Sequence, residues 1–371
     1  MTSTIDYDLH GVVRVRLLDA TPADAAVITQ QLGPIQTDTD GRPDITIRFV
    51  DRLETTSPVR YIGLDDAAFT DDAYLVLRSK HKASARVQIP MDRIGEGCDI
   101  VVERGLPAVP LLIAIVNMTA LSKGVVPLHA SAFTYEGKGV VVTGWAKAGK
   151  TEALLSFMAR GATYIGDEWI YLSCDGEKMF GIPEPIRLWT WQLEQMPRYQ
   201  RAVSAGDRRK LRLIGVTASG LDRLASNGLA RRTLPTGSMT RFAAALKRQL
   251  NVQIPPAKLF GTEACQPTGK PDLFIFMVSH DSAKTGLEPM DADEIAGRMV
   301  FSSQVEYFDL LTHYWKFRFA FPDRPNPLIE RLQALELETL RQALGGKKTY
   351  RLAHPHPVSI PALFDIIYPV L

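Results

Sequence analysis

The stretch GWAKAGKT (144–151) follows the apolar run GVVVT (139–143) and leads into the amphipathic segment TEALLSFMARG (151–161). A strand, a glycine-flanked loop and a helix in this order are typical of a phosphate-binding loop, or Walker A motif, with the pattern G-x-x-x-x-G-K-T. Gly144 and Gly149 allow the backbone to direct N–H groups at anionic oxygens. The helix that begins after Gly149 adds unpaired N–H groups and its positive dipole end. The sequence therefore predicts a nucleotide-phosphate site here.

Within this loop, residue type predicts individual roles. Lys150 would reach the outer phosphates, and the Thr151 hydroxyl would hold Mg²⁺. Trp145 is unusual in a loop that prefers small residues, and it would either cover the nucleotide or pack outward. A surface loop that matches the pattern by chance is the alternative, and the flanking strand and helix argue against it. The predicted nucleotide-contacting residues are Gly144, Trp145, Ala146, Lys147, Ala148, Gly149, Lys150, Thr151 and Glu152.

An acidic pair, Asp167 and Glu168, ends the next apolar run, ATYIGD (162–167). In P-loop enzymes an acidic residue at such a strand end holds the magnesium ion. A solvated pair of surface carboxylates is the alternative interpretation. If parallel strands flank the P-loop, their carboxyl ends meet at one edge of the sheet, which favours the metal site. Either carboxylate is also a candidate to accept a proton from a hydroxyl group.

Composition sets broad limits on the protein class. The chain has 371 residues, enough for two domains, with a hydrophobic share of 46%, a charged share of 23% and a net charge of +2. Three scattered cysteines form no C-x-x-C pair, so neither a zinc site nor a disulfide framework is indicated. The N-terminus lacks the features of a secretory signal, and the apolar run 110–121 is too short to span a bilayer. We therefore expect a cytoplasmic protein with no membrane segment.

The N-terminal part, residues 1–122, is predicted to be a smaller α+β domain that contributes to acceptor recognition. The segment TPADAAVITQQLG (21–33) has the capping residues of a helix, with Thr21 at its start and Gly33 at its end. A buried apolar helix over about 108–122 would close the domain. Its predicted strands are 12–18, 44–50, 73–79, 85–90 and 98–104.

The remaining residues, 123–371, are predicted to form an α/β P-loop domain with a mixed sheet. Asp175-Gly176 is a strong hairpin signal between two short apolar runs. His354 and His356 alternate with prolines near the end of the chain, and loop geometry explains this pattern better than a metal site. Predicted strands lie near 127–135, 139–143, 162–167, 272–280 and 349–354, with helices over 151–161, within 190–250 and 291–345, and from 359.

Basic residues are concentrated in one region. Residues 187–248 hold 13 Lys and Arg against 3 Asp and Glu, whereas residues 1–128 hold 13 against 17. Exposed arginines on solvated helices are the simplest interpretation. A dock for an acidic acceptor over 198–248 is the functional alternative. Nucleic-acid binding is not favoured, because no aromatic interleaving or recognised motif accompanies the charge.

The block from HASA (129–132) through GKTE (149–152) and RG (160–161) to the acidic pair resembles the HPr kinase/phosphorylase family. HASA and GDE (166–168) are also similar to the ATP-dependent phosphoenolpyruvate carboxykinases. The resemblance covers 127–190 and implies a P-loop kinase core of this type, with ATP and Mg²⁺ as cofactors. It implies catalytic roles for His129, Lys150, Asp167 and Glu168, and metal binding by Thr151 and Asp167. Taken alone, His129 would be interpreted as a core histidine.

This chain departs from the family pattern in two places. Its second acidic residue is Glu168 rather than Asp. It has GIPEPIRLW (181–189) in place of the family's Leu-Glu-x-Arg-Gly segment, and Glu184 with Arg187 is the nearest counterpart of the family's metal and phosphate ligands. The run P-x-P-I-x-L resembles the broader HPr-kinase-like group, which includes kinases of free serine and of peptides. This resemblance argues against HPr as the acceptor and leaves the reverse phosphorylase reaction open.

Two functional hypotheses follow from the sequence. The first is an ATP-dependent phosphotransferase that moves the γ-phosphate to a hydroxyl group on a peptide, protein or small metabolite. The second is a catalytically idle, nucleotide-gated scaffold. Presence of the full set His129, Lys150, Thr151 and Asp167 favours the enzyme. A homo-oligomer is compatible with either hypothesis.

Overall fold

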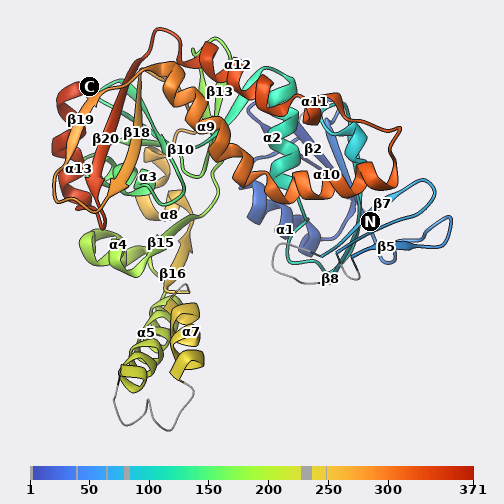
Figure 1. Ribbon diagram of the computed structural model, residues 1–371, viewed down its shortest axis with the longest axis horizontal. Helices are drawn as coiled ribbons and strands as arrows, with labels where there is room; N and C mark the ends of the chain where they lie inside the picture. The colour runs from blue at the N-terminus through green and yellow to red at the C-terminus, as the bar shows by residue number, and fades with distance from the viewer. Residues whose placement is uncertain (1–2, 39–40, 64–65, 79–83, 227–235, 248) are drawn as a thin grey trace.

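The computed structural model describes residues 3–38, 41–63, 66–78, 84–226, 236–247 and 249–371. It is a mixed α/β structure with two large sheets side by side and a projecting helical arm (Figure 1). Within the described residues no helix is both long enough and apolar enough to cross a bilayer.

The N-terminal sheet has nine strands in the order β3-β1-β2-β4-β9-β8-β7-β6-β5. β2, β4 and β9 pair in parallel, and the remaining pairs are antiparallel. The five strands predicted from alternation are present, and β1, β3, β5 and β6 are additional. The strands are β1 Ser3–Leu9, β2 Val13–Ala20, β3 Gln36–Thr37, β4 Ile45–Val50, β5 Arg60–Ile62, β6 Ala67–Phe69, β7 Tyr74–Arg78, β8 Ser84–Gln88 and β9 Cys98–Glu103.

Two helices of this part form where the sequence predicts them. α1 (Pro22–Leu32) begins at Thr21, whose side-chain oxygen accepts the Asp24 backbone N–H while Asp24 accepts the Thr21 N–H, a capping box. α2 (Leu112–Ser122) is the predicted apolar helix and is buried over most of its length. It packs against β10 (Val125–Tyr135), and Tyr171 donates a hydrogen bond of 2.6 Å to Asn117 of α2. α2 therefore joins the two sheets.

The second sheet has the strand order β17-β14-β13-β10-β11-β18-β20-β19, with β12 also paired to β10. β11, β18 and β20 are parallel to one another, and β10 is antiparallel to β11. The remaining strands are β11 Lys138–Gly144, β12 Thr163–Gly166, β13 Trp169–Ser173, β14 Met179–Gly181, β17 Thr268–Gly269, β18 Leu273–His280, β19 Gly286–Pro289 and β20 Lys348–Pro355.

The helices around this sheet largely follow the sequence pattern. α3 (Lys150–Met158) and α13 (Ile360–Ile367) pack together. α3 ends at Met158, short of the predicted end at 161. Gly161, whose φ is +91°, lies in the turn that follows, and the N–H of Ala162 bonds back to the carbonyl of Phe157. The region 291–345 contains α9 (Ala292–Glu306), α10 (Phe308–Ala320), the short α11 (Pro327–Glu330) and α12 (Leu332–Leu344).

α10 returns to the N-terminal sheet although it lies late in the chain (Figure 1). Its His313 Nδ1 lies 2.9 Å from the Tyr74 hydroxyl, and its Lys316 pairs with Asp66. Beyond α10, Arg324 pairs with Asp92. Residues after 123 therefore cover part of the N-terminal sheet as well as their own.

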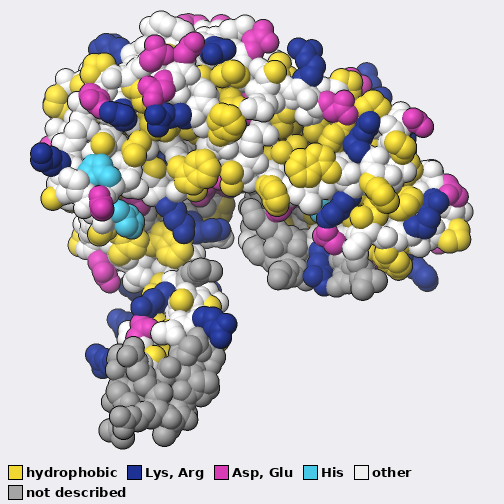
Figure 2. Space-filling view, in the orientation of Figure 1, with side chains coloured by type: hydrophobic (Ala, Val, Ile, Leu, Met, Phe, Trp, Pro, Cys, Tyr) yellow, Lys and Arg dark blue, Asp and Glu magenta, His cyan; other side chains and the backbone are white. Residues whose placement is uncertain are grey.

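Large apolar side chains are exposed along α9 and α10 (Figure 2). The opposite face of each helix is buried in the core. The fold thus leaves this row open to solvent. Its members are Phe301, Val305, Phe308, Trp315 and Phe319, each more than half exposed.

The predicted basic region forms the arm. α5 (Ala205–Ser226) packs on α7 (Thr236–Lys247), and Lys247 pairs with Asp222. The arm projects from a two-stranded sheet of β15 (Ile186–Trp189) and β16 (Asn251–Ile254), with α4 (Thr190–Gln195) and α8 (Pro256–Phe260) beside its base (Figure 1). Lys and Arg side chains are visible on it (Figure 2). The basic run at 229–234 lies outside the described residues.

A buried glutamate between α9 and α12 predicts a pH-dependent stability. Glu336 is fully buried and accepts a hydrogen bond from Gln304; burial raises the pKa of its carboxyl from 4.5 to about 8. The folded state therefore holds a proton that the unfolded state releases, so stability falls as pH rises from about 4.5 to about 8. Glu336→Gln is expected to gain a few kcal/mol relative to the wild type over this interval, at roughly 1.4 kcal/mol per pKa unit.

Urea unfolding of both proteins at acidic and alkaline pH measures this gain. Glu338→Gln, at an exposed position of the same helix, is the control and should keep the wild-type pH dependence. If the free energy of unfolding changes with pH in the same way for the wild type and Glu336→Gln, Glu336 is not the source of the pH dependence.

Candidate functional site

The loop between β11 and α3 requires both of its glycines. Gly144 has φ +142°, and a Cβ there would lie 2.5 Å from the carbonyl oxygen of Met277. Gly149 has φ +104°, and its Cβ would lie 2.9 Å from the Met277 side chain. At Gly144 a side chain would collide with the β18 backbone, whereas at Gly149 the positive φ, rather than the contact with the flexible end of Met277, restricts the position to glycine. The loop therefore has the local geometry that the motif predicts.

Lys150 is the first residue of α3 and is almost completely buried. Its Nζ donates hydrogen bonds to the carbonyl oxygens of Gly144 (3.2 Å) and Trp145 (3.0 Å). Burial lowers the pKa of this amine, although Glu168 and Asp167 nearby act in the opposite direction. The ammonium group thus lies under the loop, beside the acidic pair.

The acidic pair lies between two strands that pair with the same neighbour. β12 and β13 are both antiparallel to β10, and Asp167 and Glu168 interrupt them. β11 is antiparallel to β10 on its other side, so β11 and β12 run in the same direction without being adjacent. The carboxyl ends of β11 and β12 therefore lie at the same edge of the sheet, as the sequence predicts. β11 has the parallel strand β18 on one side, as the sequence predicts, whereas the antiparallel strand β10 lies on its other side and separates it from β12.

Asp167 faces the start of α3. The Thr151 hydroxyl lies 3.0 Å and 3.2 Å from its two carboxylate oxygens. Burial, and then the neighbouring charge of Glu168, raise the pKa of Asp167 from 3.8 to about 7 despite the Thr151 hydrogen bond and Lys150. A hydroxyl and a carboxylate, both oxygen donors, thus stand together beside the phosphate loop.

Glu168 is oriented differently and belongs to a chain of three groups. Its backbone φ is +72°, and its Oε2 lies 3.1 Å from Nε2 of His129. The other ring nitrogen of His129 lies 3.1 Å from Oε1 of Glu306, at the end of α9. Burial alone would lower the pKa of His129, but the two glutamates outweigh burial and raise it. The hydrogen bond from His129 in turn lowers the pKa of Glu168.

Glu184 adds a third carboxylate to the pair. It lies in the segment between β14 and β15, and its Oε1 is buried without a hydrogen-bond partner. Burial, then Glu168 and Asp167, raise its pKa well above 4.5. Arg187 contributes an opposing positive charge to Glu184 and Glu168, and its own side chain is exposed.

These groups fit a magnesium ion. Mg²⁺ prefers oxygen ligands and is held by one or two carboxylates together with water and phosphate oxygens. Thr151, Asp167 and the unpartnered oxygen of Glu184 supply such donors, and a cation would relieve the crowding of negative charge that raises both pKa values. In the described parts of the chain, no three His, Cys, Asp or Glu residues are placed to hold a metal ion by themselves. The site would therefore depend on phosphate oxygens to complete the coordination.

Five of the predicted site residues converge, whereas Trp145 and Lys147 lie at the outer surface of the loop. His129, Lys150, Thr151, Asp167 and Glu168 form one connected cluster. Glu152 is buried in the first turn of α3 and accepts a 2.7 Å hydrogen bond from Gln192. Trp145 is 53% exposed, which excludes packing in the core. The indole therefore remains at the outer surface of the loop, as does Lys147.

Two residues of this site were not predicted from the sequence. Glu306 reaches His129 from α9. The Nε2 atom of His354, at the end of β20, is 2.7 Å from the carbonyl oxygen of Ala148. His354 therefore contacts the backbone of the loop directly. From the sequence alone, His354 is interpreted only as part of a proline-rich turn. No sequence signal identifies it, because its place beside the loop depends on the pairing of β11 with β18 and of β18 with β20.

No protein-family model matches this chain, and no curated protein matches it.

Proposed function

We propose that this protein is an ATP-dependent phosphotransferase with a P-loop kinase core of the HPr-kinase-like type. The observation that carries the proposal is the convergence of five side chains at the ends of β11 and β12, beside β10: His129, Lys150, Thr151, Asp167 and Glu168. Phosphoryl transfer requires a phosphate cradle, a cation, an oxygen-ligand set for Mg²⁺ and a proton acceptor. Each requirement has a candidate among these groups. The mixed sheet with three parallel strands is compatible with this class of core.

In the proposed reaction, the acceptor hydroxyl oxygen attacks the γ-phosphorus of ATP. A new O–P bond forms, the bond from the γ-phosphorus to the β–γ bridging oxygen breaks, and ADP leaves with that electron pair. Glu168 takes the hydroxyl proton, because its carboxylate is half exposed (47%) and is held by His129. Lys150 stabilises the negative charge that builds on the phosphate oxygens, and Mg²⁺ held by Thr151 and Asp167 would supply further positive charge there.

The roles of the two acidic residues separate in this proposal. Asp167 is oriented by the Thr151 hydroxyl and is the metal ligand, with Glu184 beside it. Glu168 faces His129 and is the proton acceptor. Glu306 on the far side of His129 orients the imidazole ring. Arg187 stands at the margin of the site, where an exposed guanidinium group is free to contact a phosphate oxygen.

The second candidate is a catalytically idle, nucleotide-gated scaffold. The exposed row on α9 and α10 and the projecting arm give it surfaces for partners. A scaffold has no requirement for a proton acceptor, whereas Glu168 is positioned by a hydrogen-bonded histidine. The position of Glu168 therefore favours the phosphotransferase over the scaffold. A cytoplasmic location, a homo-oligomer and docking of an acidic acceptor on the arm remain predictions.

The decisive experiment follows phosphate from ATP labelled at the γ position. The purified full-length protein is incubated with Mg²⁺, labelled ATP and an extract of its source cells, and the transfer of label is compared with that of Asp167→Asn. We expect label in a specific acceptor with the wild type alone. Tight binding of ATP without turnover would instead support the scaffold.

A further inference from the structure

The apolar row on α9 and α10 has no role in the proposed reaction. Its members are Phe301, Val305, Phe308, Trp315 and Phe319, each more than half exposed. They follow one another at intervals of four, three, seven and four residues, a spacing that keeps them on one face of a helix. A single residue separates the end of α9 from the start of α10, so the row extends over both helices (Figure 2).

The area of the row is sufficient for a specific interface. Single apolar side chains on a surface are normal, whereas a group of large ones marks a binding surface. Four of the five are aromatic, and a half-exposed aromatic side chain presents on the order of 100 Å² to solvent. Two copies packed through the row would therefore bury about 1,000 Å² from these side chains alone, which reaches the lower limit for a specific interface.

The rest of the described surface offers no second apolar area that could receive the row. The other exposed large apolar side chains of the described residues are Tyr61, Trp145, Leu213, Val216, Phe242 and Tyr368. Three of them belong to the arm, where they stand among basic residues, and the others lie in three separate parts of the fold. A head-to-tail contact between copies would therefore leave the row opposite a polar surface. The row of one copy is matched by the same row of another, which is the contact of a dimer with two-fold symmetry.

Charge on the two helices disfavours a lipid surface as the occupant of the row. A helix that lies in a membrane interface combines an apolar face with an excess of Lys and Arg, which attracts anionic lipids. α9 and α10 together carry four acidic residues against three Lys or Arg residues. One of those three, Lys316, already pairs with Asp66. The row therefore lacks the basic border that a membrane-binding face requires.

We propose that two copies of this chain form a two-fold symmetric dimer through the apolar row on α9 and α10. The dimer removes from water the large side chains that a single copy leaves exposed. This inference does not depend on the proposed phosphotransferase function, because the contact requires neither ATP nor an acceptor.

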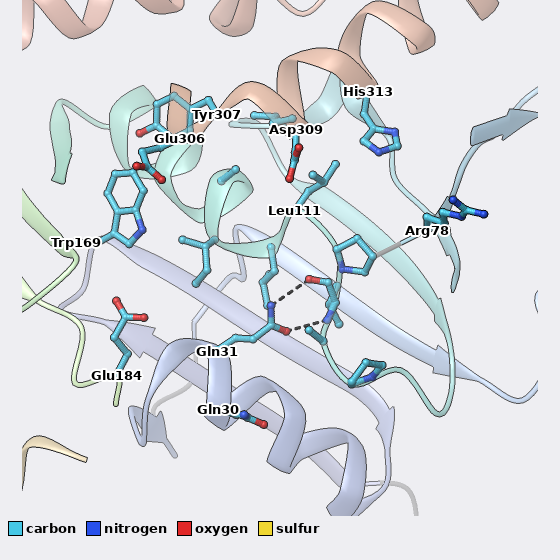
Figure 3. Close-up of a pocket in the computed structure, with 18 of the residues that line it drawn as sticks. Gln30, Gln31, Arg78, Leu111, Trp169, Glu184, Glu306, Tyr307, Asp309 and His313 are labelled. Carbon is cyan, nitrogen blue, oxygen red and sulfur yellow. Dashed lines mark hydrogen bonds between the residues drawn. The ribbon is translucent and has the colours of Figure 1, made fainter. Parts of the chain in front are cut away.

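The interface would lie beside the proposed site. A cavity of about 830 Å³ between the two sheets is lined by Glu306 and Asp309, which are neighbours of Val305 and Phe308 in the chain (Figure 3). Glu306 also lies 3.1 Å from His129. A second copy on the row would therefore border this cavity and hold the end of α9 that carries Glu306.

Sedimentation velocity of the full-length protein over a series of concentrations measures the assembly. We expect a species of twice the chain mass of 41.1 kDa at micromolar concentration. The double substitution Phe308→Glu with Trp315→Glu places charges in the interface, so its dimer dissociation constant should rise roughly a hundredfold or more. A wild type that is monomeric at the highest concentration, or that forms open-ended larger assemblies, would overturn the proposal.

Leu213→Glu with Val216→Glu is the matched control, because it makes the same change at two exposed apolar positions of the arm. This control should form dimers as the wild type does. A normal dimer in Phe308→Glu with Trp315→Glu, or loss of the dimer in the control alone, would show that another surface makes the contact. Thermal melting of dilute samples verifies that both double variants are folded.

Hydrogen exchange of the wild type provides a measurement that requires no substitution. Backbone amides of α9 and α10 should exchange more slowly at high than at low protein concentration, whereas those of α5 should keep their rates. Equal exchange of α9 and α10 at both concentrations would contradict the proposal. Co-sedimentation with vesicles of neutral and of anionic phospholipid tests the competing occupant, and a monomeric wild type that binds vesicles would assign the row to a lipid surface instead.

Discussion

Replacement of Lys150 by Ala is expected to reduce phosphate transfer roughly a thousandfold, because it removes the cation that stabilises developing charge on the phosphate oxygens. Mg·ATP affinity should fall as well, since the same ammonium group contacts the bound phosphates. Folding should persist. Burial lowers the pKa of Lys150, so the folded state gains little from its charge, and the helix it begins has a good helix former in its place.

The measurement combines label transfer, ATP titration and thermal melting of the purified variant. Lys138→Ala removes an exposed lysine at the opposite end of β11 and is the control for loss of positive charge alone. Near wild-type transfer by Lys150→Ala, with unchanged melting, would refute the proposed mechanism. A melting temperature far below that of the wild type would show that Lys150 supports the fold rather than the reaction.

The parts of the site that the sequence predicts are those encoded by contiguous residues. Gly144, Gly149 and Lys150 are fixed by the strand, loop and helix that immediately surround them, so local spacing is sufficient to place them. Asp167 and Glu168 end an apolar run in the same block. Their neighbours in space, β10 and α3, are also neighbours in the chain. This explains why the phosphate loop and the acidic pair could be predicted from the sequence to lie together.

Glu306 and His354 could not be found in this way. Glu306 is placed by the path of α9 across the sheet, and His354 by the addition of β20 beside β18. Both contacts join residues that are far apart in the chain, and no local period encodes such contacts. Alternation predicts a strand over 127–135, but it does not show that β10 pairs with β11 on one side and with β12 and β13 on the other.

In the N-terminal sheet, too, the sequence predicts only some of the strands and contacts. Five strands are predicted from their alternation. β3, β5 and β6 have only two or three residues each and are too short for a pattern, whereas β1 has seven residues and is not predicted either. The course of α10 is equally invisible in the sequence. Its apolar residues predict a helix, but its contacts with Tyr74 and Asp66 depend on tertiary packing. The cavity between the sheets follows from that packing.

The two acidic residues give the sharpest test of the chemistry, because their environments differ although they are adjacent. Glu168→Gln removes the proposed proton acceptor while leaving Thr151 and Asp167 in contact. Transfer is expected to fall roughly a hundredfold or more, with Mg·ATP affinity close to that of the wild type. Asp167→Asn removes the charged metal ligand, so we expect a comparable loss together with a higher Mg²⁺ requirement.

Titration of transfer rate and ATP binding against Mg²⁺ separates these outcomes. If Asp167→Asn keeps the wild-type Mg²⁺ dependence while Glu168→Gln loses it, the two roles are reversed. The pH profile provides an independent readout, since the lowered pKa of Glu168 depends on the hydrogen bond from His129. His129→Ala should therefore move the acidic limb of the profile towards higher pH, as the carboxylate returns to its ordinary pKa. An unchanged acidic limb in His129→Ala would mean that Glu168 is not the group that takes the proton.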